Sequence, residues 1–139
     1  MHRENFIPIV HFEPIEYICR MYERKIPISL NCGLDLIGEV LYGKWKIRLL
    51  CFINQGQKRP SELQRKIPDA SRRVLNTQLK ELEEHGIIEK TIYPVVPPKV
   101  EYNITEFGTT LLPVIKTMGQ WGDKNKEQLQ SAITKRLSN

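Results

Sequence analysis

Residues 71–85, SRRVLNTQLKELEEH, constrain the fold of this chain more than any other stretch. At 100° per residue, Leu75, Leu79 and Leu82 fall on one stripe of a helix. The opposite stripe follows the spacing i, i+3, i+4, i+7 and carries Arg73, Asn76, Thr77 and Lys80. The pattern predicts a helix that buries its leucines in a core and leaves this polar face free for a partner.

The order of charges along this helix favours a polyanionic partner. Arg72 and Arg73 lie in the first turn, where the helix macrodipole disfavours cations by about 0.3–1 kcal/mol each. Glu83 and Glu84 lie toward the last turn, where the macrodipole disfavours anions. A polyanion across the N-terminal end would favour this order, because backbone N–H groups and guanidinium groups would point at it together. The alternative is that the two arginines are a solvated surface pair.

A shorter helix precedes this one. Pro60 suits a first helical turn, and Leu63 and Ile67 form an i, i+4 core pair. Pro68 prevents continuation, and residues 68–70 form a short turn into the next helix. Two helices joined in this way, the second with an exposed polar face, predict a helix-turn-helix, in which the second helix enters the major groove of DNA.

The chain after residue 85 changes from helical to strand periodicity. Gly86 is a left-handed C-cap signal. Residues 88–93 and 100–104 alternate with a period of two on either side of a proline-rich tip. This predicts a two-stranded hairpin directly after the recognition helix, which is the arrangement of a winged helix. Lys90 and Lys99 would place cations along this wing, beside the DNA backbone.

Residues 32–54 form two apolar-periodic pieces that meet at Tyr42 and Gly43. The second piece is expected to be a core helix, and its apolar stripe comprises Trp45, Leu49, Phe52 and Ile53. The stripe makes Trp45 a core residue rather than a binding platform.

Both ends of the chain are expected to be helical and to take part in assembly. Residues 1–31 form an extension with a short helix after Pro14, which must dock on the main domain or on a second subunit, since it is too short to be stable alone. Residues 105–139 carry an apolar stripe, then an interruption at Gly122 and Asp123, then a polar helix. The stripe is expected to form a homodimer interface rather than to close the monomer core, and it comprises Phe107, Leu111, Ile115, Met118 and Trp121.

Composition limits the class of function. The 139 residues fit one domain with appended segments, and the net charge of +5 favours an anionic partner. No apolar run reaches the ~18 residues that span a bilayer, and the start is not a signal peptide, so the chain is expected in the cytoplasm. Three cysteines without CxxC spacing indicate neither a disulfide framework nor a metal site. Without a phosphate loop, GxSxG or HExxH motif, neither an enzyme nor a cofactor is expected.

Taken together, residues 32–122 resemble the HxlR-type transcription regulators, bacterial winged-helix proteins related in architecture to the MarR group. The wing, residues 96–102 with the sequence VPPKVEY, is the most specific match. The other matching positions are Cys32, Gly43, Lys44, Trp45, Arg59, Glu62, Leu63, Ile67, Pro68, Ser71, Leu75, Leu79, Leu82, Glu83, Gly86, Tyr93, Ile104, Thr105, Glu106, Gly108, Leu111, Pro113, Trp121 and Gly122. The chain departs from the family pattern at Gly33, Pro60, Asn76 and Lys99, which concerns the cognate DNA sequence rather than DNA binding.

The resemblance implies a homodimer that binds a two-fold operator in double-stranded DNA and acts as a repressor or activator. We expect a mostly α-helical fold with a β-hairpin wing: a winged helix-turn-helix domain at residues 32–104, with terminal dimerisation segments at residues 1–31 and 105–139. A repressor is the sign of regulation we expect. The expected DNA-contacting residues are Arg59, Ser61, Ser71, Arg72, Arg73, Asn76, Thr77, Lys80, Lys90 and Lys99.

Two further hypotheses concern regulation and an alternative function. Some relatives sense oxidants or electrophiles through a cysteine at the position of Cys32, and a thiol near a helix N-terminus is more reactive. Cys32 is therefore either a sensor for a small-molecule or oxidant inducer or a small packing residue. The alternative function is a winged helix that binds another protein without specific DNA binding. The polar face distinguishes the two functions, because an interaction module would carry apolar residues there.

Overall fold

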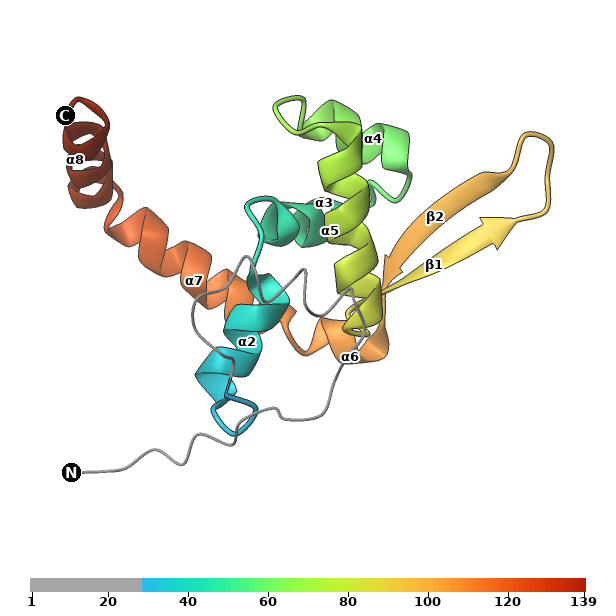
Figure 1. Ribbon diagram of the computed structural model, residues 1–139, viewed down its shortest axis with the longest axis horizontal. Helices are drawn as coiled ribbons and strands as arrows, with labels where there is room; N and C mark the ends of the chain where they lie inside the picture. The colour runs from blue at the N-terminus through green and yellow to red at the C-terminus, as the bar shows by residue number, and fades with distance from the viewer. Residues whose placement is uncertain (1–28) are drawn as a thin grey trace. The chain divides into compact units, whose positions relative to one another are not determined.

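A computed structural model describes residues 29–139, which fall into two units with a boundary between Tyr42 and Gly43. The short helix expected after Pro14, together with Cys19, lies outside the described residues. Figure 1 shows the order of the elements, and their bounds are α2 (Gly33–Leu41), α3 (Lys46–Asn54), α4 (Pro60–Lys66), α5 (Arg72–Glu84), β1 (Ile88–Tyr93), β2 (Lys99–Ile104), α6 (Glu106–Thr109), α7 (Leu112–Lys124) and α8 (Lys126–Leu137). The fold is mostly helical with one antiparallel hairpin, as the sequence predicts.

The first unit contains α2, which begins after Cys32 at the N-cap position. The Cys32 side chain makes no capping hydrogen bond, and Asp35 lies in the first turn, where it complements the helix dipole. Leu34 and Leu36 are exposed, and no residue of α2 is fully buried.

The core of the second unit lies where α3, α4 and α5 contact one another (Figure 1). Each of these helices is too short to be stable alone, and each is stabilised by packing one apolar stripe into the core. The buried apolar side chains are Trp45, Leu49, Leu50, Ile53, Leu63, Ile67, Ala70, Leu75, Leu79, Leu82, Ile87, Ile88, Tyr102, Leu111 and Ile115. The predicted core positions of α4 and α5 are therefore confirmed.

The stripe on α3 differs from the predicted one. Trp45 is buried as expected, but it is the N-cap of α3 and not a residue within the helix. Counted from the true start, the buried positions are Lys46, Leu49, Leu50 and Ile53, at i, i+3, i+4 and i+7. Phe52, expected in the core, is only half-buried. The predicted stripe began one position too early, at Trp45, and included Phe52 in place of Lys46 and Leu50.

The hairpin is confirmed, with Ile88 paired to Ile104 and Tyr93 paired to Lys99. Gly86 ends α5 with a φ of 73°, the left-handed conformation that glycine adopts without a steric penalty. Burial is confined to the base of the wing: Ile88 is 1% exposed, but Ile92 is 61% exposed. The reason is that the hairpin extends beyond the helices that cover its base (Figure 1).

A tight junction joins the end of α5 to α6. The Thr105 hydroxyl donates to the carbonyl of Gly86 at 2.6 Å, and the Thr105 N–H donates to the carbonyl of Ile87 at 3.0 Å. The Gly108 N–H in turn donates to the Thr105 hydroxyl oxygen at 2.9 Å. A Cβ on Gly108 would lie 2.1 Å from the Ile87 carbonyl oxygen, so only glycine fits at this position.

The C-terminal helices correct two predictions. The helix expected from residue 105 is divided into α6 and α7, because Pro113 lacks an N–H and its ring would clash with the carbonyl four residues earlier. The break expected at Gly122 and Asp123 is wrong: α7 continues to Lys124, and α8 follows directly after Asn125.

Candidate nucleic-acid interface

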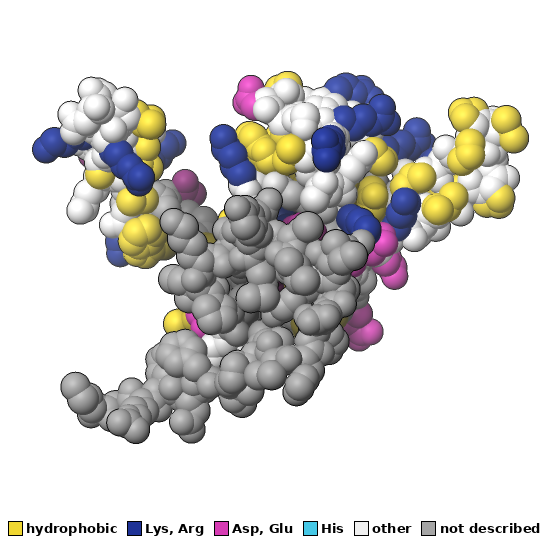
Figure 2. Space-filling view, viewed as in Figure 1, with side chains coloured by type: hydrophobic (Ala, Val, Ile, Leu, Met, Phe, Trp, Pro, Cys, Tyr) yellow, Lys and Arg dark blue, Asp and Glu magenta, His cyan; other side chains and the backbone are white. Residues whose placement is uncertain are grey.

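Helix α5 separates a core face from the polar face defined above. Leu75, Leu79 and Leu82 are at most 2% exposed. The side chains on the opposite side, Arg72, Arg73, Asn76, Thr77 and Lys80, are all exposed. Figure 2 shows Lys and Arg side chains gathered over α4 and α5. The structure thus gives α5 a continuous polar surface with cations concentrated at its N-terminal end.

Local bonds fix the N-terminal end of α5. The Ser71 hydroxyl oxygen accepts a hydrogen bond from the Val74 N–H at 3.2 Å, so Ser71 is the N-cap. Thr77 donates its hydroxyl hydrogen to the Arg73 carbonyl at 2.9 Å. Lys80 lies 3.9 Å from Glu84 in an exposed i, i+4 pair, which contributes little to stability. Ser71 therefore has a structural role of its own, in addition to its position beside the polar face.

The turn between α4 and α5 is held by a side chain that the sequence analysis did not identify. The Gln64 side-chain amide donates to the Ala70 carbonyl at 2.8 Å and to the Ile67 carbonyl at 3.4 Å. Each carbonyl ends one side of the turn, so one amide fixes the angle between the two helices. A glutamine three residues before the predicted end of a helix is a weak sequence signal, because most such side chains are solvated.

The start of α4 is fixed by Glu62. Its carboxylate accepts hydrogen bonds from the N–H groups of Lys58 and Arg59, at 3.0 and 3.1 Å. Arg59, the N-cap of α4, and Ser61, in its first turn, are both exposed. Two of the expected DNA-contacting residues thus lie on a rigid helix start next to the turn.

The Glu101 carboxylate on the wing pairs with two of the residues expected to contact DNA, Lys99 and Arg59. Glu101 lies 3.1 Å from the Lys99 Nζ and 3.9 Å from the Arg59 Nε, and it accepts a hydrogen bond from the Tyr93 hydroxyl at 3.3 Å. The hydrogen bond from Lys99 is the main reason that the pKa of Glu101 is below its usual range. The Tyr102 N–H also donates to the Lys58 carbonyl at 2.8 Å. These contacts attach β2 to the start of α4.

Lys90 differs from Lys99 because it is exposed on β1 outside this cluster. Tyr102, its partner across the hairpin, is buried, and burial raises the pKa of its phenol, with a smaller contribution from the charge of Glu83. The structure therefore brings Arg59 and Lys99 together, while Lys90 remains free to contact another molecule.

The opposite end of α5 is fastened to the start of α3. The Gln78 side-chain oxygen accepts a hydrogen bond from the Trp45 N–H at 3.0 Å, and Lys46 Nζ lies 2.6 Å from the Glu81 carboxylate. We call these two interactions the α3–α5 clamp. Lys46 is 1% exposed and is the one charged or polar side chain buried in the described part of the chain. Its place in the i, i+3, i+4, i+7 stripe could have indicated its burial from sequence.

Cysteine 32 lies in the first unit and Cys51 in the second. Both thiols are free and half-buried.

The expected dimer residues divide into two groups by their exposure. Leu111 and Ile115 are each 8% exposed, because they pack into the core of their own chain, whereas Phe107, Met118 and Trp121 are exposed.

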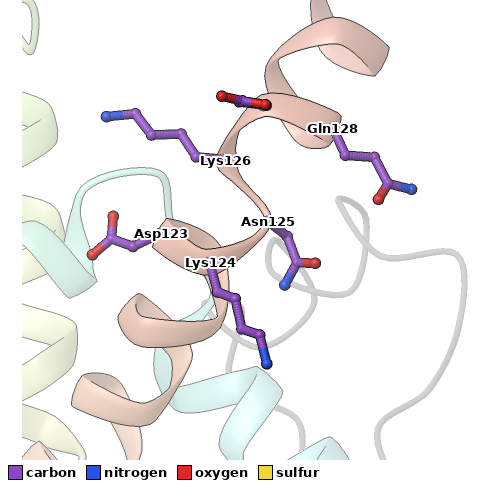
Figure 3. A pocket seen from close by; sticks show the side chains of 6 residues that line it. Asp123, Lys124, Asn125, Lys126 and Gln128 are labelled. Atoms are coloured by element: carbon purple, nitrogen blue, oxygen red, sulfur yellow. The ribbon is translucent and has the colours of Figure 1, made fainter.

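A surface hollow of about 410 Å³ lies where α7 meets α8 (Figure 3). It is lined by Asp123, Lys124, Asn125, Lys126, Glu127 and Gln128, none of which the sequence analysis selected. Figure 3 shows Asp123 and Lys126 on one side of the chain and Lys124 and Asn125 on the other, so these side chains do not converge on a ligand.

Among residues 29–139, none of the helices has the length and apolar character needed to cross a bilayer.

The helix-turn-helix, the hairpin after it and the exposed polar face of α5 define a winged-helix regulator. The chain belongs to the HxlR-like helix-turn-helix family, whose model matches residues 40–130. It is therefore a transcriptional regulator of the helix-turn-helix type, and the resemblance seen in its sequence is confirmed.

Named relatives agree with this assignment. The chain is 42% identical over 113 residues to the HTH-type transcriptional regulator YybR of Bacillus subtilis (strain 168), and the match covers 80% of this chain and 90% of YybR. The solved structure of the redox regulator HypR in its reduced form is 42% identical, with a TM-score of 0.69 over 72% of this chain and 99% of HypR. The reduced form of the transcriptional regulator YodB from B. subtilis is 34% identical, with a TM-score of 0.59 over 67% of this chain and 92% of YodB.

Proposed function

We propose that the chain is a repressor that binds double-stranded DNA sequence-specifically, as a homodimer on a two-fold operator. Helix α5 enters the major groove, and the wing lies along the backbone. The observation that carries this proposal is the exposure of Arg73, Asn76 and Lys80 directly opposite a buried leucine stripe. A helix with this surface can present hydrogen-bond donors to base edges without disturbing its own core.

The side chains on this surface have different roles in the proposal. Arginine and asparagine can each make paired hydrogen bonds to one base, so Arg73 and Asn76 are the candidates for sequence discrimination. Lys90 carries a point charge on the wing and is the candidate for a phosphate contact, which is independent of sequence. Arg72 and the capped N-terminus of α5 also favour a phosphate.

The homodimer is supported by apolar surface on the C-terminal helices. Phe107 is 64%, Met118 47% and Trp121 61% exposed, and large exposed aromatic and aliphatic side chains of this kind mark interaction surfaces. The proposed interface uses these three residues, since Leu111 and Ile115 already pack within the chain. A two-fold dimer matches an operator with two half-sites. Light scattering at micromolar concentration checks this, and a monomeric mass would contradict it.

The test of DNA recognition compares specific and random DNA, with an operator first selected from a random library. Replacing Arg73 or Asn76 with alanine is expected to cost about 1–3 kcal/mol on the operator and little on random DNA. Lys90→Ala is expected to weaken both equally. Equal losses on both DNAs for all three variants would contradict the assigned roles. Failure to select any operator, with retained folding, would favour the protein-interaction alternative.

We infer that Cys32 is a thiol sensor that weakens DNA binding when it is modified. Its thiol makes no capping hydrogen bond at the start of α2 and is partly accessible. The similarity to HypR, a redox regulator solved in reduced and oxidized forms, and to YodB, solved after diamide treatment, favours this function over simple packing. Modification adds bulk or charge, and it can shift DNA affinity only if the bound and free states tolerate it differently.

Cys51 provides the matched control for this test. Diamide is expected to reduce operator affinity of the native protein and of Cys51→Ser, but not of Cys32→Ser, which should bind DNA normally. Mass spectrometry follows which thiol reacts. If Cys32→Ser loses affinity as the native protein does, Cys32 is a packing residue.

A further inference from the structure

We propose that the α3–α5 clamp is a positioning device: Lys46, Gln78 and Glu81 set the rotation at which α5 presents its polar face. This inference rests on the proposed function, because it concerns how DNA-contacting residues are held. None of the three touches DNA in the proposal. They act through α5, which carries the residues that do.

The first argument is the cost of burying a charge. Lys46 is 1% exposed and its partner Glu81 is 24% exposed, so forming the pair removes one cation almost wholly from water. Buried ion pairs can often be replaced by apolar side chains of similar size with no loss of stability, or with a gain. An apolar residue at position 46 would also continue the stripe of Leu49, Leu50 and Ile53. Stability alone therefore does not explain the pair, whereas a directional contact between two helices does.

The second argument is the position of the clamp around α5. At 100° per residue, Gln78 and Glu81 lie on the flank between the leucine stripe and the polar face. The leucine contacts are non-directional and tolerate small rotations of the helix about its axis. The clamp bonds are directional, and they lie one turn apart along α5 while reaching two successive residues, Trp45 and Lys46. Two such bonds on one flank resist rotation, which would move the polar face relative to the groove.

The third argument is the chain segment to which the clamp is attached. Gly43 has a φ of 144°, and a Cβ there would lie 3.1 Å from Cδ of Gln78, so backbone and side chain are in close approach. The start of α3 and the Gln78 side chain are therefore packed closely together, so Gln78 has little room to leave the Trp45 N–H.

The test replaces the ion pair by an apolar pair. In Lys46→Met/Glu81→Leu we expect an unchanged or raised Tm, because the core loses a buried charge. Operator affinity is expected to fall about 2- to 30-fold, the range typical of residues that act through a coupling network, with affinity for random DNA unchanged. The matched control is Lys126→Met/Glu127→Leu, which makes the same two replacements at exposed, consecutive residues of α8. Native operator affinity in a folded Lys46→Met/Glu81→Leu protein would overturn the proposal.

A second variant and a measurement without DNA keep the test independent of folding and of the proposed function. Gln78→Met removes the acceptor for the Trp45 N–H at a half-exposed site, and it is expected to increase hydrogen exchange at Trp45. Residual dipolar couplings of the free protein report the orientation of α5 relative to α3. We expect that orientation to change in both variants but not in the α8 control. An unchanged orientation would overturn the clamp even if DNA binding were lost, whereas native protein that does not select an operator would contradict only the proposed function.

Discussion

The two halves of α5 are held in different ways. In the N-terminal half, the polar side chains Arg72, Arg73 and Asn76 are exposed, and the fixing bonds are the Ser71 cap and the turn held by Gln64. In the C-terminal half, the clamp fixes one flank, and the tight junction after Gly86 fixes the end. The surface proposed to bind DNA and the contacts that hold the C-terminal half of α5 therefore lie about one to two turns apart along the helix.

This difference separates two properties of one helix: the binding of a partner and the attachment of the helix to the fold. Substitutions on the exposed half are expected to change binding with little effect on folding, because surface positions away from caps change stability by about 0.5 kcal/mol or less. Substitutions in the C-terminal half, which carries the clamp, are expected to change protein stability or the orientation of α5. The following predictions test that separation, from the largest expected effect to the smallest.

The largest effect is expected at the junction after α5. Gly108→Ala places a methyl group 2.1 Å from the Ile87 carbonyl oxygen, so the backbone must move. We expect a loss of about 3 kcal/mol in the free energy of unfolding, at the upper end of overpacking effects. This corresponds to a fall in Tm on the order of 10 °C, measured by thermal unfolding.

Gly119→Ala is the matched control, because a Cβ at Gly119 meets nothing within 4 Å. It lies within α7, where alanine is favoured over glycine by up to about 1 kcal/mol, so its Tm should rise or remain the same. If Gly108→Ala and Gly119→Ala had the same Tm, the close approach at the junction would not limit stability.

At the exposed end of α5, the expected effect on folding is smaller. Ser71→Ala removes the cap on the Val74 N–H and is expected to lower the free energy of unfolding by about 1 kcal/mol. Ser71→Asp keeps a capping oxygen, so it should retain stability, but its negative charge should weaken binding to any DNA. Chemical denaturation and DNA titration of both variants separate the two roles. Equal stability of Ser71→Ala and the native protein would contradict the capping role.

Lys90 tests the exposed surface of the wing. Lys90→Ala is expected to reduce the slope of log affinity against log salt concentration by about 1, because one phosphate contact is lost. Its stability should not change, since the side chain is exposed on β1. DNA binding at several salt concentrations measures the slope, with Lys135→Ala on α8 as the control. An unchanged slope would place Lys90 outside the DNA contact.

The smallest effect concerns the acid Glu101. Its lowered pKa means that the folded state favours the carboxylate, chiefly through Lys99. The stabilisation is complete above the ordinary glutamate pKa of about 4.3 and is lost as the pH falls through the lower folded value. NMR titration should show Glu101 ionising below the usual range, and Lys99→Met should raise its pKa. A normal titration in the native protein would show that the wing cluster does not form in solution.

The sequence predicted the elements whose cause is local. The leucine spacing of α5, the left-handed position of Gly86 and the alternation of the hairpin each follow from a periodicity or a backbone preference within a few residues. For the same reason the sequence identified the polar face, because helical periodicity alone determines which side chains lie opposite a buried stripe.

The parts that sequence could not give depend on contacts between distant residues. The spacing of Lys46 places it on the buried stripe of α3, but its partner Glu81, 35 positions later, could not be identified from the sequence. Arg59 and Lys99 converge because Glu101 lies between them. The division between α6 and α7 is different in kind, because Pro113 is a local signal for a helix start, whereas the apolar spacing around it alone predicts one continuous helix.

The exposed half of α5 also has a consequence for evolution. Arg73, Asn76 and Thr77 are exposed on the side of α5 opposite the buried leucines, so each can be replaced without unfolding the protein. If these residues contact bases as proposed, a single such replacement changes the preference for one base pair by about 1–3 kcal/mol. On the proposed function, duplicated copies of a gene for this chain would acquire separate operators by a few point mutations, each step encoding a folded regulator.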